Sequence, residues 1–291
     1  MNYQHAFHAG NFADVHKHAV LTLILDYLRA KPAAFRVIDS HAGSGRYDLL
    51  GPEAMRSGEW CDGIARVVQA LPALRDSAAY ALLKGYSEVV GALNADGKLR
   101  LYPGSPLIAK ARLRQQDRLI ACELEPRAAA SLESVLHGDP RAKVLAMDGW
   151  TAIGANVPPK ERRGLVLIDP PFEDAADFTR LAVALGEAHR KWPTGIYMLW
   201  YPIKQRDAAD ALARRLRRLA VPKVLRSEIT LEPPRADAGL VGSGLIVVNP
   251  PYTLERDLKI LLPVLVRVLS PAAVQKLDWL VREGEGTLAR R

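Results

Sequence analysis

The sequence predicts a doubly wound α/β fold in which seven strands form a mostly parallel sheet. Short apolar runs alternate with amphipathic helical segments along most of the 291 residues. Polar or acidic residues follow the apolar runs, as in sheets whose two faces are covered by helices. The expected strands cover 35–39, 119–124, 143–148, 164–169, 195–200, 223–232 and 243–249. Because such sheets bind ligands at the carboxyl ends of their strands, Asp39, Glu123, Asp148 and Asp169 should meet in one cleft.

The expected helices account for most of the remaining chain. Residues 15–29, 126–136, 175–192 and 205–220 have the apolar spacing of amphipathic helices. The connection between Arg46 and Leu119 is far longer than a single crossover requires. Near its end, Ser105 as an N-cap and Pro106 as the first helical residue predict the first crossover helix. We therefore assign 49–100 to an inserted helical subdomain, and 1–48 with 101–291 to the core.

Composition and charge restrict the class of protein. Lys and Arg number 40 against 32 Asp and Glu, so the formal net charge is +8. This excess fits a polyanionic partner such as nucleic acid, although charge alone identifies none. Cys61 and Cys122 stand alone without a CxxC motif, which argues against a disulfide framework and favours a reducing, cytoplasmic location.

The hydropathy pattern predicts no targeting or membrane segment. Residues 1–18 lack the charged start and the long apolar core of a signal peptide. The longest charge-free apolar stretches, such as 192–203, are too short to cross a bilayer. Without a heptad pattern or an interface stripe, we expect a monomer.

A glycine-rich turn follows the first expected strand. Gly43 and Gly45 form a G-x-G pair, but the third glycine of a dinucleotide fingerprint would fall at position 48, an aspartate. The missing glycine and the insertion argue against NAD. A tight turn without a ligand stays open as the alternative.

Two strand ends favour a nucleoside ligand. Glu123 can accept both hydroxyls of a ribose, and Asp148-Gly149 can accept an adenine amino group while leaving room for the ring. Together these residues predict an adenosine site without a pyrophosphate-binding fingerprint, which fits S-adenosylmethionine. Its carboxylate would suit the start of the helix at Ser105.

Asp169-Pro-Pro-Phe172 is the most informative short motif. Its two prolines cannot continue a central strand, so the chain leaves the sheet rigidly at the cleft. The Asp169 carboxylate and the Pro170 carbonyl then project as two acceptors, with Phe172 as a stacking surface. Two acceptors that hold an exocyclic amine support the positive charge that develops during methyl transfer. A base must leave its helix to reach them; a buried turn without chemistry is the alternative.

A second motif, Asn249-Pro-Pro-Tyr252, fits the same general pattern. It follows the last strand, which runs antiparallel in sheets of this kind. Its carboxyl end should therefore lie at the opposite edge of the sheet. We assign catalysis to Asp169 and a structural role to 249–252.

Two clusters of charged or titratable residues have competing interpretations. Four histidines lie within residues 5–18, but no cysteine is near and Asp14 does not complete a convincing zinc site, so we expect no metal. Between Lys204 and Arg226, eight basic residues stand against two acidic ones. This segment is either a solvated helix face or a contact with an RNA backbone, to which 160–163 could add.

The motifs together resemble those of a known family. The segments are YQHAFHAGNFADVHKH (3–18), DSHAGSGRY (39–47), YPGSP (102–106), CELEP (122–126), MDG (147–149), LIDPPF (167–172), GIYMLWYPI (195–203) and GLIVVNPPY (244–252). They are similar to the RlmJ family of bacterial ribosomal RNA methyltransferases over nearly the whole chain. The resemblance implies a Rossmann-like class I methyltransferase that uses S-adenosylmethionine to methylate N6 of one adenine in 23S rRNA. The substrate would be naked rRNA or an assembly intermediate.

The resemblance also implies roles for particular residues. The cofactor would be held by Lys17 or His18, His41, Gly43, Ser105, Glu123, Asp148 and Gly149, next to Asp169. Asp169 would be the catalytic carboxylate, and Tyr3 would act near the substrate. The N-terminal segment would fold over the cleft, with Lys17 pairing with the cofactor carboxylate. Phe172 stands where tyrosine is common in this motif class, so stacking survives but a hydroxyl is lost.

Three other functions remain as alternatives. A DNA adenine N6-methyltransferase would normally carry a sequence-reading module, and the insertion at 49–100 is small for one. A protein glutamine methyltransferase favours an NPPY motif, which here follows the wrong strand. A non-catalytic RNA-binding protein could share the fold, but the intact Asp169 and Glu123 argue against it.

Overall fold

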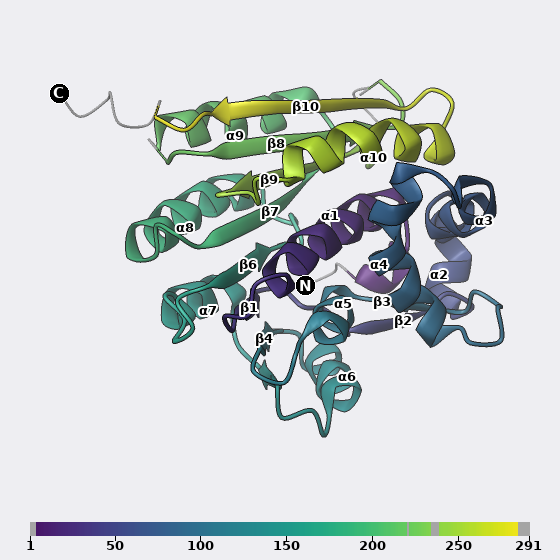
Figure 1. Ribbon diagram of the computed structural model, residues 1–291, viewed down its shortest axis with the longest axis horizontal. Coiled ribbons are helices and arrows are strands. Elements are labelled where there is room, and N and C mark those ends of the chain that lie inside the picture. Colours follow the sequence, from purple (N-terminus) through teal and green to yellow (C-terminus); the bar gives the residue numbers. More distant parts are fainter. Residues whose placement is uncertain (1–3, 220, 234–238, 285–291) are drawn as a thin grey trace.

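A mixed eight-stranded sheet forms the centre of the molecule (Figure 1). The computed structural model describes residues 4–219, 221–233 and 239–284. The strand order is β10-β8-β9-β7-β6-β1-β4-β5. The strands are β1 (Arg36–Asp39), β4 (Arg118–Cys122), β5 (Ala142–Leu145), β6 (Gly164–Ile168), β7 (Ile196–Ile203), β8 (Val224–Thr230), β9 (Gly242–Val248) and β10 (Val274–Val281). The five strands from β7 to β5 are parallel, and β8, β9 and β10 join by antiparallel pairing.

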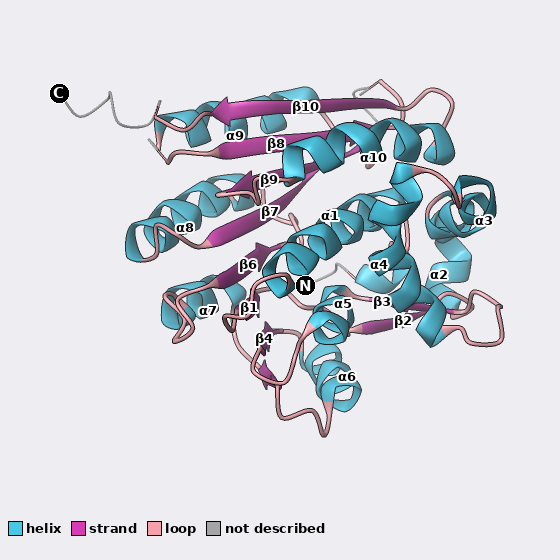
Figure 2. Cartoon of the chain, viewed as in Figure 1, coloured by secondary structure: helices cyan, strands magenta, loops and turns pink. Residues whose placement is uncertain are grey.

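Helices cover both faces of the sheet, as the near-continuous apolar strands require (Figure 2). One face is covered by α7 (Gly149–Asn156), α8 (Asp177–Lys191) and α9 (Arg206–Arg218). The other is covered by α1 (Phe12–Arg29), α5 (Ser105–Arg112), α6 (Pro126–Leu136) and α10 (Leu254–Leu269). The doubly wound α/β prediction is therefore confirmed.

The prediction of seven strands was short by one, because β10 adds an eighth at the edge of the sheet. This strand has weak apolar alternation, and its first three residues are exposed. Opposite charges across the pair align it with β8: Lys276 lies opposite Glu228, and Asp278 lies opposite Arg226. Arg226 donates hydrogen bonds of 2.8 and 2.7 Å to the Asp278 carboxylate. Cross-strand ion pairs of this kind select a register that local pattern does not show.

The antiparallel direction of β9 is confirmed, and it places 249–252 away from the carboxyl edge of the parallel strands. The end of β9 at Val248 lies opposite Tyr197, near the start of β7. Asn249 donates two 2.8 Å hydrogen bonds to the carbonyls of Pro193 and Gly195. Its amide therefore joins two loops at the opposite edge of the sheet, as a structural role requires.

The segment 49–100 is mainly helical, and a two-stranded antiparallel ribbon connects it to the rest of the chain. It contains α2 (Pro52–Ser57), the 3-10 helix η2 (Glu59–Asp62), α3 (Ile64–Leu74) and α4 (Ala78–Leu93). Its ends are joined where β2 (Arg46–Asp48) pairs with β3 (Leu101–Pro103). Side chains of α3 and α4 share one apolar core with α1 and α10. The division of the chain into a core and an inserted subdomain stays a prediction.

The predicted N-cap of the first crossover helix was wrong by one residue. Gly104 caps α5, and Ser105 is its first helical residue. The buried Ser105 side chain lies near the Asp39 carboxyl, whose two oxygens have no hydrogen-bond partner among the described residues. This proximity brings the start of α5 to the end of β1.

Candidate active site

A cleft of about 750 Å³ opens at the carboxyl edge of the parallel strands. It lies where β1, β4, β5 and β6 end and where the N-terminal segment and α5 begin. Its walls contain ten residues that the sequence singled out: Lys17, His18, His41, Gly43, Ser105, Glu123, Asp148, Gly149, Asp169 and Pro170. The sheet thus brings together side chains that are widely separated along the chain.

The glycine turn after β1 is held by the strand-end carboxylate of β4. The Gly43 N–H donates a 2.8 Å hydrogen bond to Glu123 Oε2, and the Glu125 N–H donates one of 2.8 Å to Oε1. Gly43 has φ = 62°, a left-handed conformation that a side chain disfavours. Glu123 therefore orders the turn, while each of its oxygens retains capacity to accept a further hydrogen bond.

Asp148 and Gly149 form the start of α7 beside His41. Asp148 caps this helix, because its Oδ2 accepts hydrogen bonds from the N–H and the hydroxyl of Thr151, both 2.8 Å long. A Cβ atom at position 149 would lie 2.2 Å from the Ser40 carbonyl and 2.7 Å from the His41 ring. Burial lowers the pKa of His41 to about 4, despite the charges of Asp169 and Asp148, so its imidazole is neutral.

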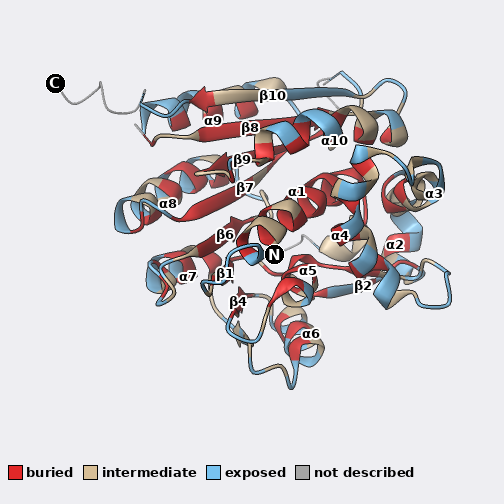
Figure 3. Cartoon of the chain, viewed as in Figure 1, coloured by how far each residue is buried: buried red, intermediate tan, exposed pale blue. Residues whose placement is uncertain are grey.

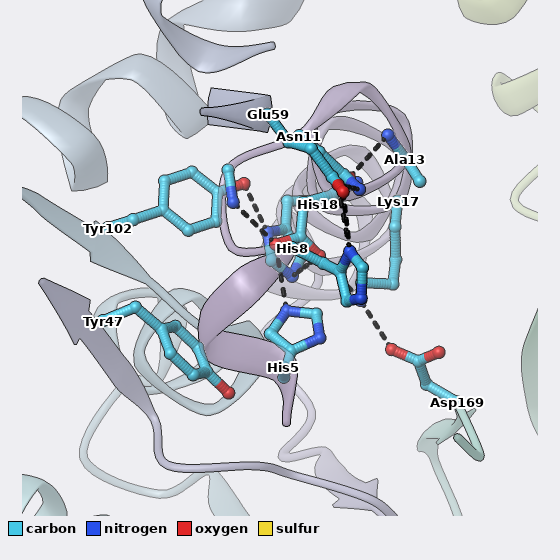
Figure 4. Close-up of polar contacts among 12 residues, drawn as sticks. His5, His8, Asn11, Ala13, Lys17, His18, Tyr47, Glu59, Tyr102 and Asp169 are labelled. Carbon is cyan, nitrogen blue, oxygen red and sulfur yellow. Dashed lines mark hydrogen bonds and ion pairs between the residues drawn. The ribbon is translucent and has the colours of Figure 1, made fainter. Parts of the chain in front are cut away.

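Lys17 lies between two carboxylates at the inner wall of the cleft (Figure 4). Its ammonium donates to Asp14 Oδ1 at 2.9 Å and to Asp169 Oδ2 at 2.5 Å. Burial alone would lower the pKa of Lys17, but the Asp14 and Asp169 charges outweigh it and hold that pKa well above its usual range. Burial would likewise raise the pKa of Asp14, but Lys17 and His5 hold it well below its usual range. The Lys17 ammonium thus joins the two carboxylates, and its contact restrains the Asp169 side chain.

Asp39 lies behind the cleft wall and is not among its lining residues. Its carboxyl is buried at the end of β1. Burial raises the pKa of Asp39 to about 7; the Ser105 hydroxyl opposes this shift and the nearby Asp169 charge adds to it. Of the four strand-end acids expected to meet, Glu123, Asp148 and Asp169 line the cleft, and Asp39 is buried behind its wall.

Phe172 is turned away from the cleft and does not line it. Its ring packs on Phe178, with centroids 4.7 Å apart, and edge-on against Trp200 at 5.7 Å. Its backbone has φ = 51°, which is an outlier for an aromatic residue. Trp200 also lies under the Lys17 ammonium, 5.8 Å from the ring centroid. The Trp200 ring therefore contacts both Phe172 of the Asp-Pro-Pro-Phe turn and the Lys17 ammonium.

The N-terminal histidines make contacts in different parts of the structure. His5 contacts Asp14 at 3.1 Å and lines the cleft beside Gln4 and Ala6. His18 lies 2.8 Å from the Tyr102 hydroxyl, and burial lowers its pKa to about 3. His16 is buried between the hydroxyls of Ser227 and Ser243.

Gln4, His5 and Ala6 of the N-terminal segment line the cleft, and Lys17 contacts the Asp14 and Asp169 carboxylates there. The pairing of Lys17 with a cofactor carboxylate stays a prediction. No group of three or more His, Cys, Asp and Glu side chains that could hold a metal is found among the described residues. Tyr3 lies outside the described residues.

Sequence reasoning missed Asp14 as part of the site. The available signal was the spacing of Asp14 and Lys17, which places both on one side of a helix. It also missed the overall charge of the cleft. Among the described residues that line it, eight are acidic and three are basic. The acidic residues are Glu53, Glu123, Glu125, Asp148, Asp169, Glu173, Asp174 and Asp177, and the basic ones are Lys17, Arg127 and Arg180.

The order of the strands, the reversed β9 and the position of the cleft are together those of an α/β methyltransferase. The family model described as "RsmJ: Ribosomal RNA large subunit methyltransferase D, RlmJ" matches residues 32–281. The chain belongs to this RlmJ family of ribosomal RNA large subunit methyltransferases. Among the described residues, no helix is long and apolar enough to span a membrane.

Relatives in three bacteria are similar over nearly their full length. The chain is 41% identical to "Ribosomal RNA large subunit methyltransferase J" of Escherichia coli (strain K12), covering 97% of this chain and 100% of that one. It is 38% identical to the protein of the same name from Haemophilus influenzae, again covering 97% and 100%. The crystal structure of protein LPL1258 from Legionella pneumophila aligns with a TM-score of 0.86 and 34% identity, covering 94% of this chain and 98% of that chain.

Proposed function

We propose that this protein transfers a methyl group from S-adenosylmethionine to N6 of one adenine in 23S rRNA. The observation that carries the proposal is the position of Asp169. Its carboxylate follows β6 within Asp-Pro-Pro-Phe and lines the same cleft as Glu123 and Asp148. An amine acceptor and a nucleoside site thus share one enclosed space.

The residues of the cleft fit the parts of the cofactor. The Glu123 oxygens accept hydrogen bonds from the ribose hydroxyls, and Asp148 accepts one from the adenine amino group. Gly43, Gly149 and the neutral His41 shape the space for the nucleoside. Ser105 begins α5, whose N-terminus attracts a carboxylate, with His18 and Lys17 nearby. The net acidic lining favours a ligand that carries a sulfonium and an ammonium.

The chain's own groups prepare the target amine. The cofactor supplies an electrophilic methyl group on a positively charged sulfur. Asp169 and the Pro170 carbonyl accept hydrogen bonds from the two amino hydrogens, and they stabilise the positive charge that develops on N6. The Lys17 ammonium orients the Asp169 carboxylate through their 2.5 Å contact. After methyl transfer, the positively charged nitrogen would lose one proton to water in the cleft, which leaves the neutral methylated amine.

The target base must leave its helix to enter the cleft. Phe172 stacks on it only if its ring turns from Phe178 and Trp200 toward the cleft. Its left-handed backbone is consistent with a turn that stores strain. Tyr3 is the second aromatic residue proposed to act near the base.

The test is transfer of labelled methyl groups to protein-free 23S rRNA, with duplex DNA in parallel. Asp169→Asn removes the negative charge of the amine acceptor, and Asp174→Asn is the matched control in the same cleft. We expect N6-methyladenosine from RNA alone and a loss of about 10²–10³-fold in kcat for Asp169→Asn. The control should keep activity within about threefold of the unmodified protein.

Three outcomes would contradict the proposal. Label in DNA alone would favour a DNA adenine methyltransferase. S-adenosylmethionine binding without transfer to protein-free rRNA or to a pre-ribosomal particle would favour a non-catalytic RNA-binding protein. Equal activity of the two variants would overturn the assignment of Asp169.

A further inference from the structure

The charge of the molecule is unevenly distributed between its two ends. The cleft is net acidic, so its own lining repels the phosphates that flank a target adenine. Protein affinity for nucleic acid comes largely from basic side chains that neutralise phosphates. The RNA backbone therefore needs a binding surface elsewhere on the protein.

The C-terminal half of α9 offers such a surface. Figure 3 marks the exposed parts of the chain. Arg214, Arg215, Arg217 and Arg218 are all exposed. Leu212, Ala213 and Leu216 of the same turns are buried against the sheet. The 3.6-residue period puts the four arginines on the opposite, solvent-facing side.

These arginines are largely free of ionic partners. Within the described residues, Arg214 and Arg218 make no ion pair, and Arg215 bonds to the Thr179 hydroxyl. Arg217 acts electrostatically on Asp278, but the Asp278 carboxylate is already held by two hydrogen bonds from Arg226.

The insertion differs from α9 in this respect. There, Arg66 pairs with Asp62, Lys84 with Glu88 and Arg100 with Asp96. Three of the six basic residues of the insertion are thus paired with nearby carboxylates, whereas Arg214 and Arg218 in the C-terminal half of α9 have no ion pair within the described residues.

The surface continues from α9 onto its neighbours. Leu219, just after α9, packs over Gly186 of α8, and Lys191 at the end of α8 donates to the Gly154 carbonyl of α7. Figure 1 shows the ends of these three helices along the same side of the sheet. We define the basic edge as Lys160, Arg162, Arg190, Lys191, Arg214, Arg215, Arg217 and Arg218, all exposed. Two acidic residues occur in the same stretches: Glu161, which pairs with Arg36, and Glu187.

We propose that the basic edge binds the phosphate backbone of the RNA whose adenine enters the cleft. This proposal rests on the proposed function for the identity of the RNA, but the binding itself does not require catalysis. Guanidinium groups on a convex helix face suit phosphates, which they contact singly or in bidentate fashion. Such contacts hold a structured RNA domain in place without reading its sequence.

Basic residues in the last turn of a helix also interact favourably with its dipole. That effect acts within one turn and stabilises the helix itself. It therefore predicts a change in protein stability and no change in RNA binding, so the two interpretations separate experimentally.

The test compares two variants that remove the same charge. One combines Arg214→Gln, Arg215→Gln, Arg217→Gln and Arg218→Gln. The matched control combines Arg75→Gln, Lys84→Gln, Lys98→Gln and Arg100→Gln, which are exposed positions of the insertion. The Kd for protein-free 23S rRNA is measured by filter binding between about 50 and about 300 mM KCl. S-adenosylmethionine affinity and Tm are measured in parallel.

We expect the α9 variant to raise the Kd for rRNA at least about tenfold near physiological salt, with unchanged cofactor affinity. The slope of log K against log salt should fall by about 3, because each lost phosphate contact removes about 0.7–0.9. The insertion control should change the Kd by less than about threefold.

Equal weakening of RNA binding by both variants would show that only the net charge matters and would overturn the proposal. An unchanged Kd with a lowered Tm would assign the arginines to helix stability. Methyl transfer plays no part in this readout, so a failure of the proposed function would be seen separately.

Discussion

The cleft and the basic edge differ in the burial and the pairing of their charged side chains. In the cleft, charged groups are buried and matched within a few ångströms: Lys17 joins Asp14 and Asp169, and Glu123 accepts two backbone N–H groups. On the basic edge, exposed arginines such as Arg214 and Arg218 stand without an ionic partner among the described residues. The first arrangement fixes the positions of the charged side chains, and the second leaves positive charge exposed to solvent.

The topology of the fold separates these two regions. Each crossover helix runs antiparallel to its strand, so the end of α9 lies at the sheet edge opposite the cleft. Under the two proposals, the cationic cofactor would meet the acidic cleft and the polyanionic RNA would meet the basic edge. The contrast can be tested by changing one region at a time.

The largest effect is expected from Lys17→Met. This substitution leaves the buried Asp14 carboxylate and Asp169 without their shared cation, and unpairing a buried charge costs about 3–5 kcal/mol. We expect the free energy of unfolding to fall by that amount in urea titrations, and kcat to fall at least about 10²-fold. The double variant Lys17→Met/Asp14→Asn should regain part of the stability but not the activity. Recovery of activity in the double variant would contradict a role for Lys17 in orienting Asp169.

Asp39→Asn tests whether the buried Asp39 carboxyl has the raised pKa that its burial and the nearby Asp169 cause. The pKa of Asp39 is raised to about 7, so the folded protein holds this proton more tightly than the unfolded chain does. Its stabilising contribution is full below about pH 4 and is lost as the pH rises through 7, by about 4 kcal/mol at most. We expect the stability of the variant to fall less than that of the unmodified protein between pH 5 and 8 in urea titrations. A parallel pH dependence in the two proteins would show that Asp39 does not titrate in this range, and the exposed Asp76→Asn variant serves as control.

Glu123→Gln should weaken the cofactor site. The amide nitrogen would face a backbone N–H, from Gly43 or Glu125, and the charge that accepts the ribose hydroxyls would be lost. Hydrogen bonds to a charged group contribute about 1.5–3 kcal/mol, so the Kd for S-adenosylmethionine should rise about 10- to 100-fold in calorimetry. Glu53→Gln removes the same charge from the same cleft and should change the Kd by less than about threefold. Similar losses in both variants would reduce the role of Glu123 to general electrostatics.

The smallest effect belongs to a single arginine of the basic edge. Arg218→Gln removes one exposed charge that has no ion pair within the described part of the chain. The slope of log K against log salt for rRNA binding should fall by about 0.7–0.9, and cofactor affinity and Tm should stay constant. If only the fourfold variant and no single variant changed the slope, the arginines would act through their summed potential and not as separate phosphate contacts.

The local features of the fold were readable because they depend on neighbours in sequence. Apolar runs predicted seven of the eight strands of the doubly wound sheet, and the bounds of α6 at 126–136 were predicted to the residue. The strand β10 was missed because its place depends on ion pairing of Asp278 with Arg226, which no local pattern contains. The cap of α5 was misplaced by one residue, because Gly104 has the extended backbone of an N-cap and Ser105 is already helical.

The candidate site divides in the same way. The positions of Glu123, Asp148 and Asp169 at the ends of expected strands were enough to predict that they lie at one edge of the sheet, because parallel strands end at the same edge. The orientation of Phe172 was not predictable, because packing against Phe178 and Trp200 selects it. Lys17 was placed in the cleft by resemblance, but its partners came from the tertiary structure.

By itself, the sequence determined the order of strands and helices, the residues at each strand end and the presence of an unneutralised run of arginines. These properties follow from periodicity and composition, which act over a few residues. Only the tertiary structure decided that Lys17 meets Asp169 across 152 positions of chain and that the cleft is net acidic. It also placed the arginines at the opposite edge of the sheet. The physical reason is that buried charges interact with whichever groups the packed core brings within a few ångströms, and sequence separation does not limit that distance.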